Sequence, residues 1–163
     1  MKRFSRTLIF TGMLAAGALS QAQTFEQSLS ASDRGDDRAA FAGFKRLGEQ
    51  GHSKAQFNVG LMYRSGRGVA ADDQQAAAWY RKAAEQGDVD AQYNLAEIYR
   101  NEHSALKDEQ AAYFWLLLAS AQGNQNAARN RDFLVRRLSL EARTSAETAA
   151  RNWQPTINVP PGR

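Results

Sequence analysis

The feature that most constrains the fold of this chain is a sequence pattern that recurs every 36 residues. Residues 49–51 (Glu-Gln-Gly) return at 85–87 (Glu-Gln-Gly) and at 121–123 (Ala-Gln-Gly). Residues 55–58 (Ala-Gln-Phe-Asn) return at 91–94 (Ala-Gln-Tyr-Asn). A fixed period of this length is typical of repeat proteins, in which each unit buries one face against the next unit.

Each unit contains two runs of apolar residues with helical spacing. In the first full unit Ala55, Val59 and Met62 share one face of a helix, and residues 76–84 form a second stripe that includes Trp79. A single helix pair would leave one face bare, and stacking successive pairs covers it. The sequence therefore predicts an all-α protein, a right-handed α/α superhelical solenoid of about seven short helices.

Polar residues and glycines mark the expected ends of these helices. Ser53 with Gln56, and Asp72 with Gln75, have the spacing in which side chains cap the start of a helix. Gly51, Gly87 and Gly123 follow the second helix of each unit, where a left-handed residue ends a helix. In the altered connection at 101–106 we expect Asn101 to take the left-handed conformation.

The N-terminal 22 residues have the features of a secretory signal peptide. Lys2 and Arg3 precede an apolar run over 8–19, and small residues precede the expected cleavage after Ala22. The run is about 12 residues against the roughly 20 that a transmembrane helix needs, although a retained anchor is the alternative. We expect a periplasmic or secreted mature protein without a transmembrane span.

Composition narrows the possible partners and chemistries. Without Lys2, Arg3 and Arg6 the chain has 18 basic residues against 17 acidic ones, so its formal charge of +4 does not indicate nucleic-acid binding. No cysteine occurs, which excludes disulfides, cysteine metal sites and a lipid-modified N-terminal cysteine.

The expected domain organisation follows from the repeat. The predicted parts are a signal peptide at 1–22, a flexible segment at 23–35, a solenoid at 36–154 and a flexible tail at 155–163. The solenoid divides into units at about 36–51, 52–87 and 88–123 and a capping unit at 124–154. The unit at 36–51 is incomplete and has Gly43 at the tryptophan position, and the units at 52–87, 88–123 and 124–154 are called the first, second and third units.

The chain closely resembles the Sel-1-like repeat family, a relative of tetratricopeptide repeats. The resemblance is carried by residues 63–69 (Tyr-Arg-Ser-Gly-Arg-Gly-Val), 79–87 (Trp-Tyr-Arg-Lys-Ala-Ala-Glu-Gln-Gly) and 91–95 (Ala-Gln-Tyr-Asn-Leu), and the ending at 138–155 resembles the capping helix of bacterial members. It implies an adaptor or scaffold for protein complexes, frequently exported. The chain departs from the family pattern at 101–106 and at Arg131, where a leucine is usual.

The related tetratricopeptide fold implies which residues line a concave groove for a partner protein. The implied groove residues are Lys54, Phe57, Leu61, Arg64, Asp90, Tyr93, Glu97, Arg100, Asn126, Arg129, Phe133 and Arg136. We hypothesise that Arg64, Arg100 and Arg136, spaced by 36, bind carboxylates of an extended partner, with Phe57 and Tyr93 as apolar anchors. The alternative is that each arginine only offsets a helix dipole.

A basic surplus after Asn124 suggests a second kind of partner. Seven arginines (Arg129, Arg131, Arg136, Arg137, Arg143, Arg151 and Arg163) stand against Asp132, Glu141 and Glu147. They favour an acidic protein or an anionic envelope polymer, or else form a solvated face.

Catalytic patterns are missing from the sequence. His52 and His103 lie 51 residues apart, which is not a multiple of the period, and no phosphate loop, metal-binding helix or nucleophile elbow occurs. We predict no catalytic residue, metal or cofactor, and hence a non-enzymatic adaptor in the cell envelope. Some cysteine-rich family members are described as β-lactamases or penicillin binders, so a peptidoglycan- or β-lactam-related binding protein or hydrolase is the alternative, disfavoured by the lack of cysteine.

Overall fold

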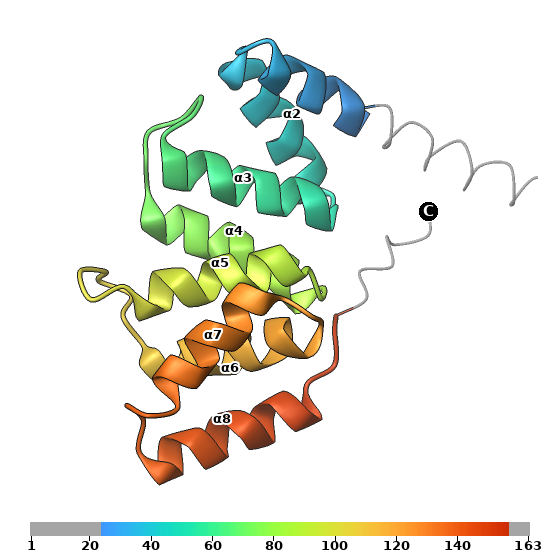
Figure 1. Cartoon of the computed structure of the whole chain (residues 1–163). Coiled ribbons are helices and arrows are strands. Elements are labelled where there is room, and N and C mark those ends of the chain that lie inside the picture. Colours follow the sequence, from blue (N-terminus) through green and yellow to red (C-terminus); the bar gives the residue numbers. More distant parts are fainter. Residues whose placement is uncertain (1–23, 157–163) are drawn as a thin grey trace, which may run out of the picture.

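The computed structural model describes residues 24–156, and its regular elements are all helices (Figure 1). A helical segment at 24–33 precedes α2 (Asp37–Glu49), α3 (Ser53–Ser65), α4 (Asp73–Glu85), α5 (Val89–Arg100), α6 (Glu109–Ala121), α7 (Gln125–Leu134) and α8 (Leu140–Asn152). This confirms the all-α solenoid. The predicted signal peptide and residues 157–163 lie outside the described residues. Within 24–156, the helices are too short or too polar to cross a membrane.

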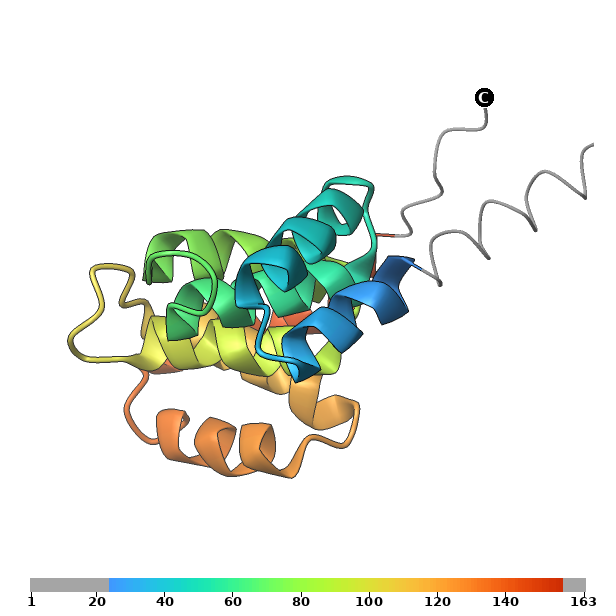
Figure 2. The same ribbon diagram turned by 90° about the horizontal axis from the view of Figure 1, so that it is seen from above.

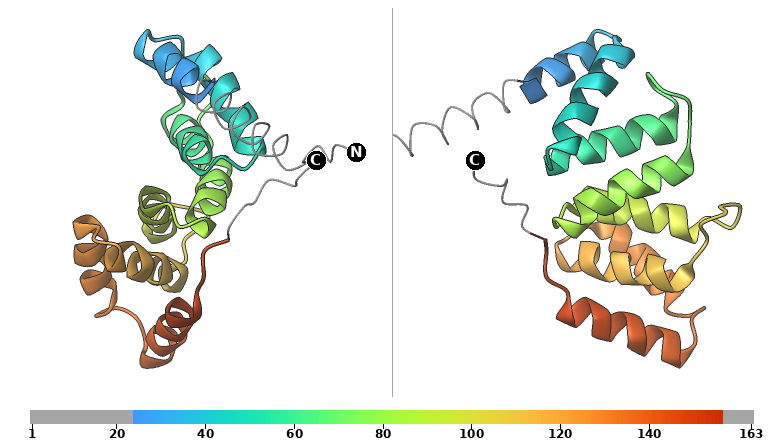
Figure 3. Two further views of the ribbon diagram at one scale, coloured as in Figure 1. Left: turned by 90° about the vertical axis from the view of Figure 1, so that its right-hand side faces the viewer. Right: turned by 180° about the vertical axis from the view of Figure 1, so that it is seen from behind.

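Successive helices stack along the molecule. From α2 to α7 each helix packs against the next, and α8 packs against α6 (Figure 3). The connection between α5 and α6, drawn in yellow, projects from one side of the stack (Figure 2). The helices of successive units therefore lie side by side, which places equivalent residues of neighbouring units close together.

Buried alanines and aromatic residues form the core. Trp79, Tyr80 and Trp115 are buried on α4 and α6, as the second stripe predicts. The alanines at equivalent positions of these helices, Ala83 and Ala119, have no exposed surface. Their small side chains let neighbouring helices approach closely, and the aromatic rings fill the remaining space.

Two buried glutamines explain why the Ala-Gln and Gln-Gly motifs repeat. Gln56 Nε2 donates to the Gly48 carbonyl oxygen at 2.9 Å, and Gln56 Oε1 accepts from Gln86 Nε2 at 2.6 Å. One period later Gln92 donates to the Ala84 carbonyl oxygen at 3.2 Å and accepts from Gln122 at 2.9 Å. Each amide thus joins two units, and its hydrogen bonds offset the cost of burying it.

The N-terminal segment corrects the prediction that residues 23–35 are flexible. Residues 24–33 are helical, with Ser28 and Ala31 buried and the Phe25 ring 5.4 Å from the Phe44 ring. A Cβ added at Gly43 would overlap the Ser28 hydroxyl and lie 3.1 Å from its Cβ. Gly43 therefore stands where the other units have a tryptophan, because the helical segment at 24–33 occupies the space that the larger side chain would need.

The start of the predicted tail is also anchored. The Thr156 amide donates to the Glu85 carbonyl oxygen at 2.7 Å, and a Cβ at Gly87 would contact Pro155 at 3.6 Å. Trp153 packs against the core beside them. Residues 155 and 156 thus belong to the folded part of the chain, which corrects the expected tail boundary.

The helix ends agree with the sequence at some positions and differ at others. Asp72 caps α4, as predicted, by accepting from the Gln74 and Gln75 amides at 2.9 Å. The glycines at 51, 87 and 123 have φ of 92°, 91° and 93°, which confirms their left-handed conformation.

The cap of α3 is His52, whose Nδ1 accepts from the Ala55 amide at 3.3 Å, so the prediction of Ser53 was wrong. Asn101 has φ −67° and is not left-handed; its side-chain oxygen instead accepts from the His103 amide at 3.0 Å.

The cap at His52 makes stability depend on pH. The ring stacks on Phe25 with centroids 4.9 Å apart, and burial lowers the pKa of His52 from 6.5. The unfolded chain then binds the proton more readily, so the free energy of unfolding falls as pH drops below 6.5. His52→Asn keeps a capping side chain without this titration. In urea denaturation at pH 7.5, 6.5 and 5.5 we expect the wild type to lose stability relative to this variant; parallel losses would exclude His52 as the cause.

Candidate protein-binding surface

The predicted groove residues other than Asn126 and Arg129, ten in all, lie outside the buried core. Six are exposed and four, Phe57, Tyr93, Glu97 and Arg100, are half-buried. The exposed residues are Lys54, Leu61 and Arg64 on α3, Asp90 on α5, Phe133 on α7, and Arg136 just beyond α7. We call the surface formed by these ten residues the A-helix face.

Contacts between side chains join the three helices of this face. Arg64 on α3 donates to the Asn94 side-chain oxygen on α5 at 3.2 Å. Asn130 on α7 donates to the Glu97 carboxylate on α5 at 2.7 Å. The first helices of neighbouring units therefore adjoin along one surface. The exposed residues Asn126 and Arg129, which the sequence also placed in the groove, pair with each other on α7.

In the second unit the arginine already holds a carboxylate of the chain itself. Arg100 Nε and Nη2 donate to the two oxygens of Glu97 at 3.1 and 2.8 Å. This hydrogen bonding to Glu97 raises the pKa of the Arg100 guanidinium. Arg100 is therefore neutralised within its own helix, and a bidentate pair of this kind is stronger than a simple contact of charges.

In the first unit the arginine has no such partner. Arg64 is exposed, and within residues 24–156 it forms no ion pair. The Tyr80 hydroxyl beside it is buried, and its own hydrogen has no acceptor in the described part of the chain. Burial raises the pKa of Tyr80 to about 12, against the opposing effects of the Arg64 charge and of a hydrogen bond from Arg64. Arg64 thus presents a cation next to an unused hydroxyl donor.

Arg136, the third of the arginines spaced by 36, has different surroundings again. Helix α7 ends at Leu134, so Arg136 lies in the turn that follows, with no side-chain hydrogen bond inside residues 24–156. Its neighbour Arg137 pairs with Glu102 at 3.0 Å and Glu109 at 2.7 Å, and lies 5.6 Å from the Phe133 ring. The structure does not bring the three arginines into equivalent places. Arg137, which the 36-residue spacing does not select, is the one that fixes this end of the α7 helix.

Comparison with known proteins identifies the repeat. The family model described as Sel1 repeat matches residues 53–88 and 89–124. This chain is a Sel1 repeat protein. Sel1 repeats typically act as scaffolds for protein–protein interaction, and the family is generally non-enzymatic.

Solved structures support the Sel1 assignment. One is a protective antigen present in uropathogenic Escherichia coli strains that displays an SLR fold, with 30% identity over 82% of this chain and a TM-score of 0.75. Another is a Sel1 repeat protein from Oxalobacter formigenes, with 28% identity over 68% of this chain and a TM-score of 0.62. The chain spans 29% of the first protein and 47% of the second. The comparison with curated proteins gave no match.

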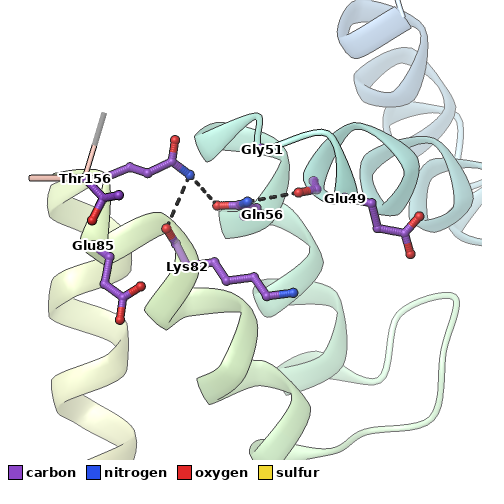
Figure 4. Close-up of a pocket in the computed structure, with 8 residues that line it drawn as sticks. Glu49, Gly51, Gln56, Lys82, Glu85 and Thr156 are labelled. Carbon is purple, nitrogen blue, oxygen red and sulfur yellow. Dashed lines mark hydrogen bonds between the residues drawn. The ribbon is translucent and has the colours of Figure 1, made fainter. Parts of the chain in front are cut away.

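Away from the A-helix face, the Sel1 stack has a hollow of about 300 Å³ at the ends of α2 and α4 (Figure 4). Figure 4 shows Gln56 inside it, with Glu49 on one side and Lys82 and Glu85 on the other. Its polar groups include the amides that join the units, so the hollow is part of the repeat's own packing. Among residues 24–156, no three His, Asp or Glu side chains gather closely enough to hold a metal ion.

Proposed function

We propose that this Sel1 repeat protein is an exported adaptor of the bacterial cell envelope that binds a segment of another protein on its A-helix face. The observation that carries the proposal is the exposure of large apolar side chains there. Leu61 is 37% and Phe133 is 51% exposed, and the same face has exposed charged residues such as Lys54 and Asp90. Exposed apolar side chains with a polar rim are typical of protein interfaces.

Export is the second part of the proposal, and the predicted signal peptide supports it. The basic start, the short apolar run and the small residues Ser20 and Ala22 before the expected cleavage are the features that secretion signals share. We expect the protein in the periplasmic or secreted fraction, with Gln23 as its first residue. Full-length protein retained in the cytoplasmic fraction would contradict this part.

Cross-linking in living cells tests the binding surface. A photoreactive residue placed at Lys54, Asp90 or Phe133 should capture one and the same envelope protein, because these positions lie on one face. Ala78, exposed on α4, is the matched control and should not capture it. Equal capture from Ala78, or none from the three test positions, would exclude the A-helix face as the binding surface.

A further inference from the structure

The second and third units show how this face holds a carboxylate. Glu97 receives two hydrogen bonds from Arg100 and one from Asn130, and its side chain is only 18% exposed. Arginine and asparagine here act together as a clamp, one from the same helix and one from the next unit. We call this set the Glu97 clamp.

The first and second units repeat the clamp without its carboxylate. Arg64 and Asn94 lie 36 residues before Arg100 and Asn130, and Leu61 stands at the position that corresponds to Glu97. With no carboxylate between them, Arg64 donates directly to the Asn94 oxygen at 3.2 Å. The donors are therefore present and the acceptor is absent.

Two further features distinguish this open position from the Glu97 clamp. The buried Tyr80 hydroxyl beside Arg64 has no acceptor for its own hydrogen in the described part of the chain, whereas Leu116 stands at the corresponding position one period later. Leu61 is exposed and Phe57 half-buried on the same helix. The surroundings thus offer an extra donor and an apolar border.

We propose that Arg64 and Asn94 bind the carboxylate of an aspartate or glutamate side chain of the partner protein. This carboxylate takes the place that the Glu97 carboxylate occupies between Arg100 and Asn130 one period later. The partner carboxylate accepts from Arg64 and from Asn94 Nδ2, which now donates to the Asp90 carbonyl oxygen at 2.8 Å. An apolar residue next to the acidic one packs on Leu61. This subsite rests on the proposed function and adds the chemistry of the bound segment.

A pair of peptides tests the subsite directly. The probes are acetylated, amidated Ala-Leu-Glu-Leu-Ala and the same peptide with Gln in place of Glu, titrated into the mature protein and followed by nuclear magnetic resonance. The Glu peptide should shift the side-chain signals of Arg64 and Asn94 and bind at least about fivefold more tightly, because a charged hydrogen bond is stronger than a neutral one. High salt should reduce the difference. Equal affinity for both peptides would overturn the subsite.

Substitutions at the open position test whether the peptide carboxylate causes the preference for the Glu peptide. Leu61→Glu supplies an internal carboxylate, as Glu97 does, and should abolish the preference for the Glu peptide; Leu61→Gln is the neutral control and should keep it. Glu97→Leu frees Arg100 and Asn130, so the Glu peptide should also shift the Asn130 signal. A preference that survives Leu61→Glu contradicts the subsite. Cross-linking from Lys54, Asp90 and Phe133 would then still decide the proposed function separately.

Discussion

Gly68→Ala should lower the free energy of unfolding by about 3 kcal/mol or more, because two penalties add at this position. Gly68 has φ +71°, where a side chain is strained. An added Cβ would also overlap the Asp37 carbonyl oxygen, lying 2.6 Å from its carbon and 3.1 Å from the Arg38 nitrogen. These are backbone atoms at the start of α2, so the clash is relieved only if the connection between α3 and α4 moves away from α2.

Gly66 is the matched control for this prediction. It has the same φ of +71°, but an added Cβ would make only ordinary contacts, the nearest being the Ala71 Cβ at 3.5 Å. Gly66→Ala should therefore cost only the backbone strain, about 1 kcal/mol. Urea denaturation followed by circular dichroism measures both. Equal losses in the two variants would show that the contact with Asp37 is unimportant.

The stack and its core could be predicted from the sequence because helical periodicity is a local property. Ala55, Val59 and Met62 share a stripe, and all three are buried. The helical segment at 24–33 was missed because it has no repeat motif and is joined to α2 by a shorter connection than the one between α3 and α4. Gly43 in place of a tryptophan was the available signal, since a missing large side chain leaves space that another element must fill.

The helix caps show that comparing equivalent positions of the units predicts a cap better than the residue spacing within one unit does. His52, Asp88 and Asn124 stand at equivalent positions, and each accepts a hydrogen bond from the amide three residues later. Ser53 fitted a general capping pattern but not this register. Aligning the three positions would have selected His52, because aspartate and asparagine are among the preferred capping residues.

The candidate surface was predictable in position and not in detail. Residues outside the apolar stripe are expected to be exposed, and the ten candidates are exposed or half-buried. Arg64 and Arg100 differ in their contacts because position 61 has a leucine, whereas position 97 has a glutamate that pairs with Arg100. The displacement of Arg136 depends on the end of α7 at Leu134, which periodicity does not define. Whether the surface binds a partner stays a prediction.

Gly60 and Tyr80 form a pair whose equivalents one period later are Ala96 and Leu116. A Cβ added at Gly60 would lie 2.6 Å from two carbons of the Tyr80 ring. The ring is fully buried and has little room to move. The glycine thus makes space for the tyrosine, while leucine in the next unit leaves space for an alanine.

A double-mutant cycle tests this complementarity. Gly60→Ala alone should cost about 2 kcal/mol, because it overpacks the core against the ring. Tyr80→Leu removes the obstacle, so adding Gly60→Ala to it should cost almost nothing or stabilise helix α3, since alanine favours a helix over glycine by about 1 kcal/mol. The expected coupling between the two substitutions is about 2 to 3 kcal/mol in thermal or urea denaturation. Additive effects would show that the ring yields to the new methyl group, and that the glycine at 60 and the tyrosine at 80 are independent features of this unit.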